Sequence, residues 1–222
     1  METFTSQLTQ LFAEQGRPAD VEAMQRYMKN KFEFFGIKKP LRAKLTQDFL
    51  KSKDLPEYES LTLIINDLWE SPQRELQYVG MELLLMHKKS WKPEILDLME
   101  KMIVKKSWWD TVDFIASNLV GNYFVRFPEN ISDKIQQWLY SENIWLQRTV
   151  ILFQLKYKKA TDQKLLFESI RYLADSKEFF IQKAIGWALR EYAKTQPTAV
   201  IQFTDSETLK PLSRREALKN LS

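Results

Sequence analysis

The feature that most constrains this chain is a weak internal repeat with a period of 35 residues. Residues 145–150 (WLQRTV) match residues 180–185 (FIQKAI) at this offset, and Tyr157 matches Tyr192. Two further steps back from the Leu-Gln pair at 146–147 reach a second Leu-Gln pair at 76–77. A period near 35 residues that holds two helices per unit is typical of an α-solenoid, in which neighbouring units stack around one continuous core.

Helical periodicity fills most of the remaining chain. The sequence has only 5 glycines, and most of its 8 prolines fall between periodic segments. No segment shows the alternating pattern of a strand. We therefore predict an all-α protein forming a single domain over residues 1–222. The predicted helices are 2–15, 18–30, 39–52, 58–69, 72–87, 92–105, 107–126, 131–140, 143–158, 161–175, 177–195, 197–203 and 212–221.

Composition narrows the possible chemistry. The chain has no cysteine and one histidine, His87, so thiolate metal sites and three-histidine zinc sites are excluded. We expect His87 to lie at the surface or at a helix end. The N-terminus lacks a signal-peptide pattern, and no apolar run approaches the length of a membrane span. These observations predict a soluble cytoplasmic protein that makes no use of a membrane.

Positive charge gathers in the second half of the chain. Residues 101–222 carry a net charge of +6, whereas residues 51–100 carry −4. A positive field of this kind favours a polyanionic partner such as nucleic acid, although a solvated basic surface gives the same count.

The segment Ser107–Phe114 (SWWDTVDF) holds the strongest candidate for chemistry. Ser107 and Asp110 have the spacing of a capping box, which predicts a helix that begins at Ser107. Trp109 then lies in the first turn, and Asp113 lies four residues later on the same face. An aromatic face beside a carboxylate suits a cation, or a centre that becomes cationic during a reaction. The alternative is a core tryptophan and a solvated aspartate.

The repeat register places further residues on the face that carries Asp113. Tyr78, Asp113, Arg148 and Lys183 are spaced by 35 residues, so they occupy one column of successive repeats. A second set shares one face of the last long helix: Lys183, Trp187, Arg190 and Lys194. This set predicts a basic strip around one tryptophan. The alternative is a packed Trp187 with a solvated basic face.

Several long segments resemble the AlkD-type DNA alkylation repair glycosylases, which are built from HEAT-like helical repeats. The resemblance spans essentially the whole chain. The segments that carry it are 26–30 (RYMKN), 105–113 (KKSWWDTVD), 143–148 (NIWLQR), 178–187 (EFFIQKAIGW) and 212–217 (LSRREA).

This resemblance implies an α-solenoid whose concave surface binds DNA. It implies hydrolysis of the N-glycosidic bond of cationic alkylated purines in duplex DNA, chiefly N7-alkylguanine and N3-alkyladenine. The family's catalytic aspartate falls on Asp113, and its two sugar-facing tryptophans fall on Trp109 and Trp187. Its phosphate-contacting arginine falls on Arg148, and its N-terminal DNA-contacting tyrosine falls on Tyr27.

The N-terminal DNA contacts follow the family less closely. Lys38 and Lys39 stand in a DNA-facing loop in which family members vary. Ala43 stands where the resemblance implies a basic residue, and Arg42 or Lys44 is expected to compensate.

The residues fit this chemistry without a cofactor or a metal. Alkylation puts positive charge on the leaving base, so no general acid is needed and one carboxylate, Asp113, can suffice. We expect Arg148, Lys183 and Arg190 to hold phosphates, which position a duplex without reading its sequence. A monomer is sufficient for this task. Two alternatives remain: a non-catalytic solenoid that binds distorted or branched DNA, and a protein-binding adaptor.

Overall fold

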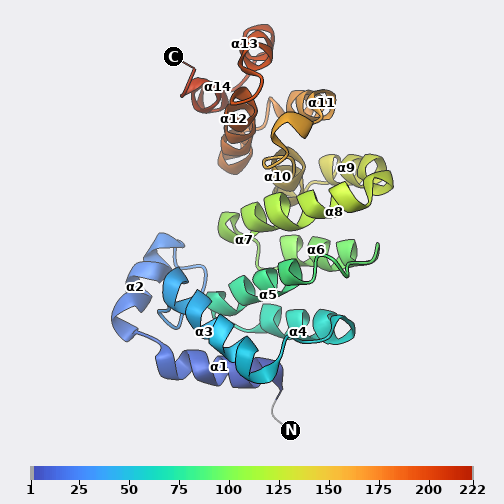
Figure 1. Ribbon diagram of the computed structural model, residues 1–222. Helices are drawn as coiled ribbons and strands as arrows, with labels where there is room; N and C mark the ends of the chain where they lie inside the picture. The colour runs from blue at the N-terminus through green and yellow to red at the C-terminus, as the bar shows by residue number, and fades with distance from the viewer. Residues whose placement is uncertain (1–2, 222) are drawn as a thin grey trace. The chain divides into compact units, whose positions relative to one another are not determined.

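Helices joined by turns and loops make up the part of the chain that the computed structural model describes, residues 3–221 (Figure 1). Those residues form no strand, and the only β-type pairing among them is an isolated bridge between Glu33 and Gln73. The predicted all-α class is therefore confirmed. None of the described helices is long and apolar enough to cross a lipid bilayer.

The chain divides into two compact units, with the division between Ser90 and Trp91. In the first unit, α4 packs against α5, and α1 packs against α3 and α4. Its helices are α1 (Phe4–Gln15), α2 (Pro18–Tyr27), α3 (Lys39–Lys53), α4 (Tyr58–Glu70) and α5 (Arg74–Met86).

The second unit carries the candidate chemistry. Its helices are α6 (Ile95–Val104), α7 (Trp109–Phe114), the π-helix η1 (Ile115–Val120), α8 (Gly121–Arg126), α9 (Ile131–Leu139), α10 (Ile144–Leu152), α11 (Gln163–Leu173), α12 (Phe179–Ala193), α13 (Pro197–Ser206) and α14 (Pro211–Leu218). Short 3₁₀ turns cover Pro128–Asn130 and Lys158–Ala160. Helix α12 is central to its C-terminal part, because α10, α13 and α14 all pack against it.

Prolines and side-chain caps start the helices largely where the sequence predicts them. Pro18, Pro197 and Pro211 each occupy the first position of a helix, where the missing N–H costs no hydrogen bond. Asn143 begins α10 by accepting hydrogen bonds from the backbone N–H groups of Trp145 and Leu146, at 2.9 and 3.3 Å.

Two predicted helices are shorter or more irregular than expected. The segment 143–158 stops being helical after Leu152, and the chain turns before Lys158, which has a φ of 55°. The segment 107–126 is not one α-helix, because α7, η1 and α8 follow one another within it.

Three copies of the repeat have a glutamine at one equivalent position, where it has the same structural role, whereas the copy that carries Asp113 has Val112 there. The Nε2 of Gln77 donates to the carbonyl oxygens of Leu68 and Ser71, at 2.8 Å each. The equivalent Gln147 donates to the carbonyls of Leu139 and Ser141, and Gln182 donates to that of Ser176. In each case the amide ties a helix to the end of the helix before it. The 35-residue period thus marks a repeated helix-to-turn connection.

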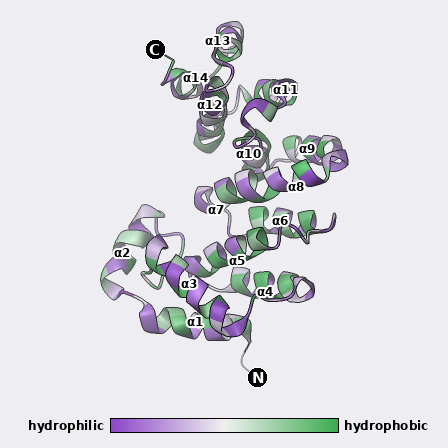
Figure 2. Cartoon of the chain, viewed as in Figure 1, coloured by the Kyte–Doolittle hydropathy of each residue, from purple (hydrophilic) through white to green (hydrophobic). Residues whose placement is uncertain are grey.

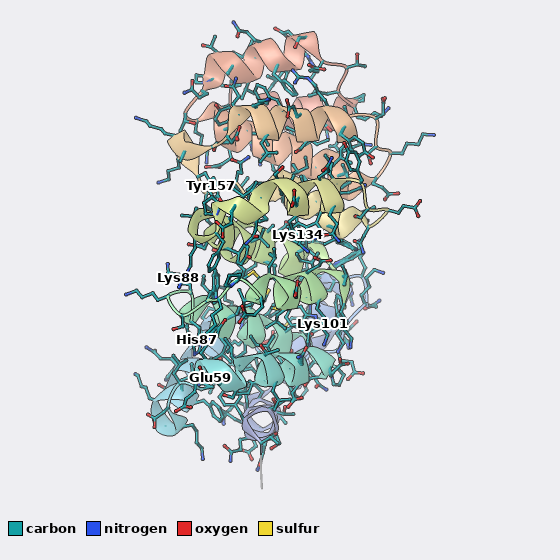
Figure 3. The ribbon with its side chains drawn as sticks, turned by 90° about the vertical axis from the view of Figure 1, so that its right-hand side faces the viewer. Glu59, His87, Lys88, Lys101, Lys134 and Tyr157 are labelled. Atoms are coloured by element: carbon teal, nitrogen blue, oxygen red, sulfur yellow. The ribbon has the colours of Figure 1, made fainter. Side chains whose placement is uncertain are left out.

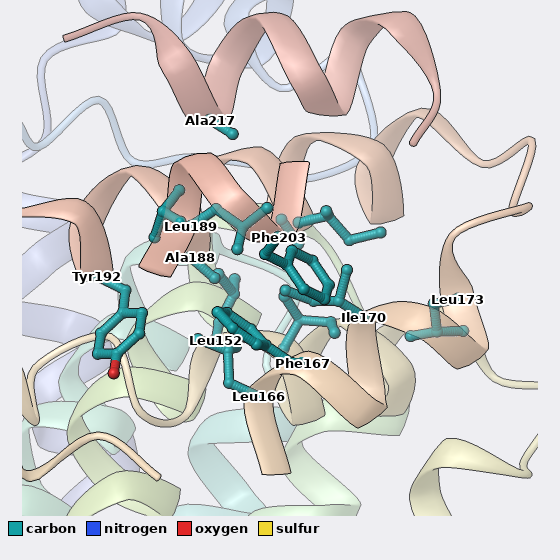
Figure 4. Close-up of a cluster of buried hydrophobic side chains, with 14 of the residues drawn as sticks. Leu152, Leu166, Phe167, Ile170, Leu173, Ala188, Leu189, Tyr192, Phe203 and Ala217 are labelled. Atoms are coloured by element: carbon teal, nitrogen blue, oxygen red, sulfur yellow. The ribbon is translucent and has the colours of Figure 1, made fainter. Parts of the chain in front are cut away.

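Hydrophobic residues recur at intervals along the helices of each unit, with hydrophilic residues between them, as a packed helical protein requires (Figure 2). The C-terminal part of the second unit has a continuous apolar core, in which Phe167 and Phe203 stack with their ring centres 4.0 Å apart. Ala188 and Leu189 enter this core from α12, and Ala217 faces it from α14 (Figure 4).

His87 lies at a helix end, directly after α5, but it is buried and not at the surface (Figure 3). Its Nδ1 is 2.9 Å from the carbonyl oxygen of Leu83, and its Nε2 is 2.7 Å from that of Pro56. Both ring nitrogens are therefore engaged with the backbone of the first unit.

Candidate functional site

The helix that carries Asp113 begins two residues later than the sequence predicts. The Ser107 hydroxyl donates to the carbonyl of Ile103 at 2.6 Å, so it bonds back to α6 and does not cap α7. The N-cap residue is Trp108, which makes no side-chain cap. Lys106, with a φ of 51°, turns the chain between the two helices. The predicted capping box is thus wrong, but Trp109 still occupies the first turn, one turn before Asp113.

Asp113 and Arg148 form a two-pronged ion pair. The Nε and one terminal nitrogen of Arg148 donate to the two carboxylate oxygens, at 2.7 and 2.8 Å. The side chain of Arg148 is 1% exposed, whereas that of Asp113 is 24% exposed. Two parallel charge-assisted bonds fix the plane of a carboxylate as well as its position. The pair therefore presents a fixed anion with part of its surface accessible.

Arg148 joins three successive repeats. Its remaining terminal nitrogen donates to the backbone carbonyl of Phe180, at the start of α12. Its guanidinium carbon also lies 5.4 Å from the ring centre of Trp187. Because the guanidinium is buried and directed at Asp113, its role in this structure is to position that carboxylate.

Burial raises the pKa of the Asp113 carboxyl above its ordinary value. The hydrogen bonds and the charge of Arg148 act in the opposite direction, and the nearby carboxylate of Asp110 adds a smaller upward contribution. The site thus combines a partly desolvated carboxylate with a cation that favours its ionised form.

An aromatic cluster packs beside the ion pair. The ring of Phe180 lies 5.0 Å from that of Trp108 and 5.0 Å from that of Trp145, and the two indoles are 5.7 Å apart. The sequence patterns described above do not indicate a role for these three residues in the site. The signal was present, since Trp145 and Phe180 are equivalent positions of the repeat. Such a cluster holds the beginnings of α7, α10 and α12 together.

A π-helix follows Asp113 directly. In η1 the wider turn changes the backbone pairing, and the Ser117 hydroxyl donates to the Asp113 carbonyl at 2.8 Å. Gly121 ends the segment at a close approach, since a Cβ there would lie 2.6 Å from the carbonyl oxygen of Phe153. Short π-helical turns occur frequently at functional sites.

The predicted basic strip lies on α12, but its charges are paired. The Lys183 ammonium lies 5.4 Å from the ring centre of Trp187. Lys183 and Arg190 both bond to the carboxylate of Glu216 on α14, at 2.9 and 3.0 Å. Lys194 pairs with Glu191 at 2.6 Å. Glu216 could not be predicted as the partner of these cations, because nothing in the local pattern of residues 212–217 indicates which helix they pack against.

The other predicted DNA contacts belong to the first unit. Tyr27 is the last residue of α2 and is 70% exposed. Lys38 precedes α3 and pairs with Asp20 at 2.6 Å, and Lys39 is the first residue of α3 and is exposed. These positions agree with surface roles, and their contact with DNA stays a prediction.

Arg42 does not supply the surface charge that Ala43 lacks. It is buried, pairs with Glu82 at 2.7 Å, and lies over the ring of Tyr78 at 4.6 Å. Of the two basic neighbours expected to compensate, only Lys44 lies at the surface.

The fold and this site define a helical-repeat protein whose second unit presents a fixed carboxylate among tryptophans and basic side chains. Residues 8–221 match the model of the DNA alkylation repair enzyme family. The chain belongs to that family. Its structure is also similar to one from Enterococcus faecalis described as a predicted DNA alkylation repair enzyme, with 33% sequence identity and a TM-score of 0.87. That similarity covers 93% of this chain and 97% of the other. No curated protein sequence matches the chain.

Proposed function

We propose that this protein is a DNA glycosylase that hydrolyses the N-glycosidic bond of cationic alkylated purines, N7-alkylguanine and N3-alkyladenine, in duplex DNA. The observation that carries the proposal is the carboxylate of Asp113, which Arg148 holds at both oxygens while 24% of the side chain stays exposed. Membership of a DNA alkylation repair family is consistent with such a substrate.

In the proposed reaction, the bond between C1′ and the purine nitrogen breaks, and its electron pair leaves with the base. This pair neutralises the alkylated base, so the leaving group needs no proton from the protein. The deoxyribose becomes oxocarbenium-like, and Asp113 stabilises that charge electrostatically. Asp113 also aligns the water whose oxygen bonds to C1′, and it accepts the proton that this water loses.

The pairing with Arg148 suits this role. A carboxylate that is partly desolvated acts more strongly on a nearby cation than one in bulk water. Without a partner, burial would instead favour the protonated form, which carries no charge. Arg148 keeps Asp113 ionised and orients it before the substrate binds, so little reorganisation is needed during the reaction.

Trp109 and Trp187 are proposed to flank the sugar with their aromatic faces. Each such contact with a cation is worth about 0.5–2 kcal/mol. Trp187 lies beside the Asp113–Arg148 pair, since the guanidinium carbon of Arg148 is 5.4 Å from its ring centre.

Four basic side chains and one tyrosine are proposed to position the duplex through its phosphates. These residues are Tyr27, Lys38, Lys39, Lys183 and Arg190, with Tyr27 contributing its ring and hydroxyl. Arg148 is also expected from the sequence to hold a phosphate, but its side chain is 1% exposed and its nitrogens bond to Asp113 and to the Phe180 carbonyl, so we propose that it acts by orienting Asp113. Phosphate contacts carry no sequence information, so selectivity comes from the charge and lability of the lesion. We further propose that the chain acts as one monomeric domain in the cytoplasm.

The test is base release from a duplex that carries N7-methylguanine at one position. The proposal predicts that the intact protein liberates free 7-methylguanine and leaves an abasic site, while an unmodified duplex stays intact. A protein that binds both duplexes and releases no base from N7-methylguanine or N3-methyladenine would instead be the non-catalytic DNA-binding solenoid.

A further inference from the structure

A single carboxylate on α14 engages both cations that flank Trp187 on α12. One oxygen of Glu216 lies 2.9 Å from the Lys183 ammonium, and the other lies 3.0 Å from a terminal nitrogen of Arg190. The two cations are two helical turns apart, so the carboxylate spans the position of Trp187. The Glu216 side chain is only 12% exposed. These pairs are therefore much less screened by solvent than ordinary surface ion pairs.

The backbone fixes the position of Glu216. Gly186 allows a close approach of α14 to α12, because a Cβ there would lie 2.4 Å from the Cβ of Glu216. The Ser213 hydroxyl on α14 also donates to the Gln182 carbonyl on α12, at 3.1 Å. The carboxylate consequently faces Lys183 and Arg190 because of how the two helices pack.

Glu216 is held in its charged form. The hydrogen bond from Lys183, together with the charges of Lys183, Arg190 and Lys219, keeps the pKa of its carboxyl below the ordinary value. Lys183 and Arg190 carry two positive charges and Glu216 carries one negative charge, so these three side chains together have a net charge of +1.

We propose that Glu216 is an internal competitor for DNA phosphates, occupying Lys183 and Arg190 until a duplex replaces it. Phosphate oxygens accept hydrogen bonds from the same ammonium and guanidinium donors that the carboxylate engages. Binding of DNA at this strip thus exchanges one anion for another and gains less free energy than binding to unpaired cations. Glu216 thereby lowers the affinity of the protein for undamaged duplex and speeds its dissociation from that duplex.

This inference rests on the proposed function only in taking the competing anion to be a DNA phosphate. Its test is binding of Glu216→Gln to a short unmodified duplex, measured by fluorescence anisotropy over a series of salt concentrations. The glutamine keeps the shape of the side chain and removes its charge. We expect about threefold to tenfold tighter binding at low salt. We also expect a steeper dependence of log affinity on log salt, by about 0.9 for each phosphate gained.

The matched control is Glu207→Gln. Glu207 pairs with Arg171 at 2.7 Å, and its side chain is 25% exposed. This variant makes the same change in net charge within the same unit but leaves Lys183 and Arg190 paired. We expect only the small gain in affinity that a general loss of negative charge produces.

Two results would overturn the inference. If Glu216→Gln matches Glu207→Gln in affinity and salt dependence, Glu216 does not compete with DNA. If it binds more weakly, Glu216 orients the two cations for DNA and does not shield them. Glu216→Ala is measured in parallel, and circular dichroism verifies that each variant is folded. Base release by the unsubstituted protein is scored separately, so failure of the glycosylase proposal is distinguishable from failure of this one.

Discussion

Arg148 donates hydrogen bonds to both carboxylate oxygens of Asp113, at 2.7 and 2.8 Å, from a position 35 residues later in the chain. One repeat therefore supplies the candidate catalytic anion, and the next supplies the cation that orients it. This arrangement makes the site a product of repeat stacking, and it determines how the site should respond to substitution.

Removing the buried cation should destabilise the protein strongly. Arg148→Met leaves the Asp113 carboxylate without its ion-pair partner and the Phe180 carbonyl without its donor. We expect the free energy of unfolding to fall by about 3 kcal/mol, as when other buried pairs lose one partner. Urea denaturation measures this change. Arg171→Met, which breaks a more exposed pair with Glu207, should cost less than about 1 kcal/mol. Equal losses in the two variants would contradict the assigned role.

The pH dependence of base release should report the environment of Asp113. Burial raises the pKa of its carboxyl, so the folded protein binds this proton more tightly than the unfolded chain does. The stability that this group contributes is thus present at low pH and is lost as pH rises through the raised pKa. Release requires the ionised form, so its rate should fall on acidification with a midpoint above about 3.9, the ordinary aspartate value. The rate without protein is subtracted, and a midpoint at or below 3.9 would contradict this account.

Two buried helix glycines should respond to alanine in opposite ways. A Cβ at Gly186 would lie 2.4 Å from the Cβ of Glu216 and 3.0 Å from the Ser213 carbonyl oxygen, so Gly186→Ala must push α14 away from α12. We expect Gly186→Ala to lower the free energy of unfolding by about 1–3 kcal/mol. At Gly80 the nearest atom, in the ring of Trp69, would be 3.7 Å away. Alanine fits at this position and has a better helix propensity than glycine, so Gly80→Ala should raise the free energy of unfolding by about 0.5–1 kcal/mol. Thermal and urea unfolding of both variants test the contrast.

The first unit depends on a buried carboxylate that no repeat pattern indicates. Glu75 is fully buried and accepts hydrogen bonds from the backbone N–H groups of Phe35, Gly36 and Ile37, at 3.2, 3.1 and 3.0 Å. Glu75→Ala leaves these donors without their acceptor and should cost about 3 kcal/mol or more. The exposed Glu59, substituted by glutamine, should change stability by less than about 0.5 kcal/mol. Both changes are read from chemical denaturation, and a stable Glu75→Ala protein would refute this assignment.

Much of the fold follows from local sequence rules. Prolines and apolar periodicity place most helices, and the 35-residue period correctly makes Asp113 and Arg148 neighbours. The same period indicates the glutamines that tie successive helices. These features are predictable because stacked repeats make similar contacts with their neighbours and use similar residues at equivalent positions.

The details of the site depend on contacts between distant segments. Ser107 has the pattern of a helix cap, but the turn at Lys106 directs its hydroxyl to the end of α6. The π-helix after Asp113 ends at Gly121, where the Phe153 carbonyl approaches so closely that a Cβ would lie 2.6 Å from its oxygen. Glu216 neutralises Lys183 and Arg190 only because Gly186 admits α14. Local patterns of residue type do not predict the last two contacts, because each of them joins segments that are distant in the sequence.

The most direct test of the central claim is release of 7-methylguanine by Asp113→Asn under single-turnover conditions, with enough protein to saturate the DNA. If Asp113 is the catalytic carboxylate, the rate should fall by about 10²–10³, while affinity for the duplex changes little. Asp110→Asn, the same substitution one turn earlier on α7, should keep most of the activity. A folded Asp113→Asn protein that releases base as fast as the unsubstituted protein would contradict the account.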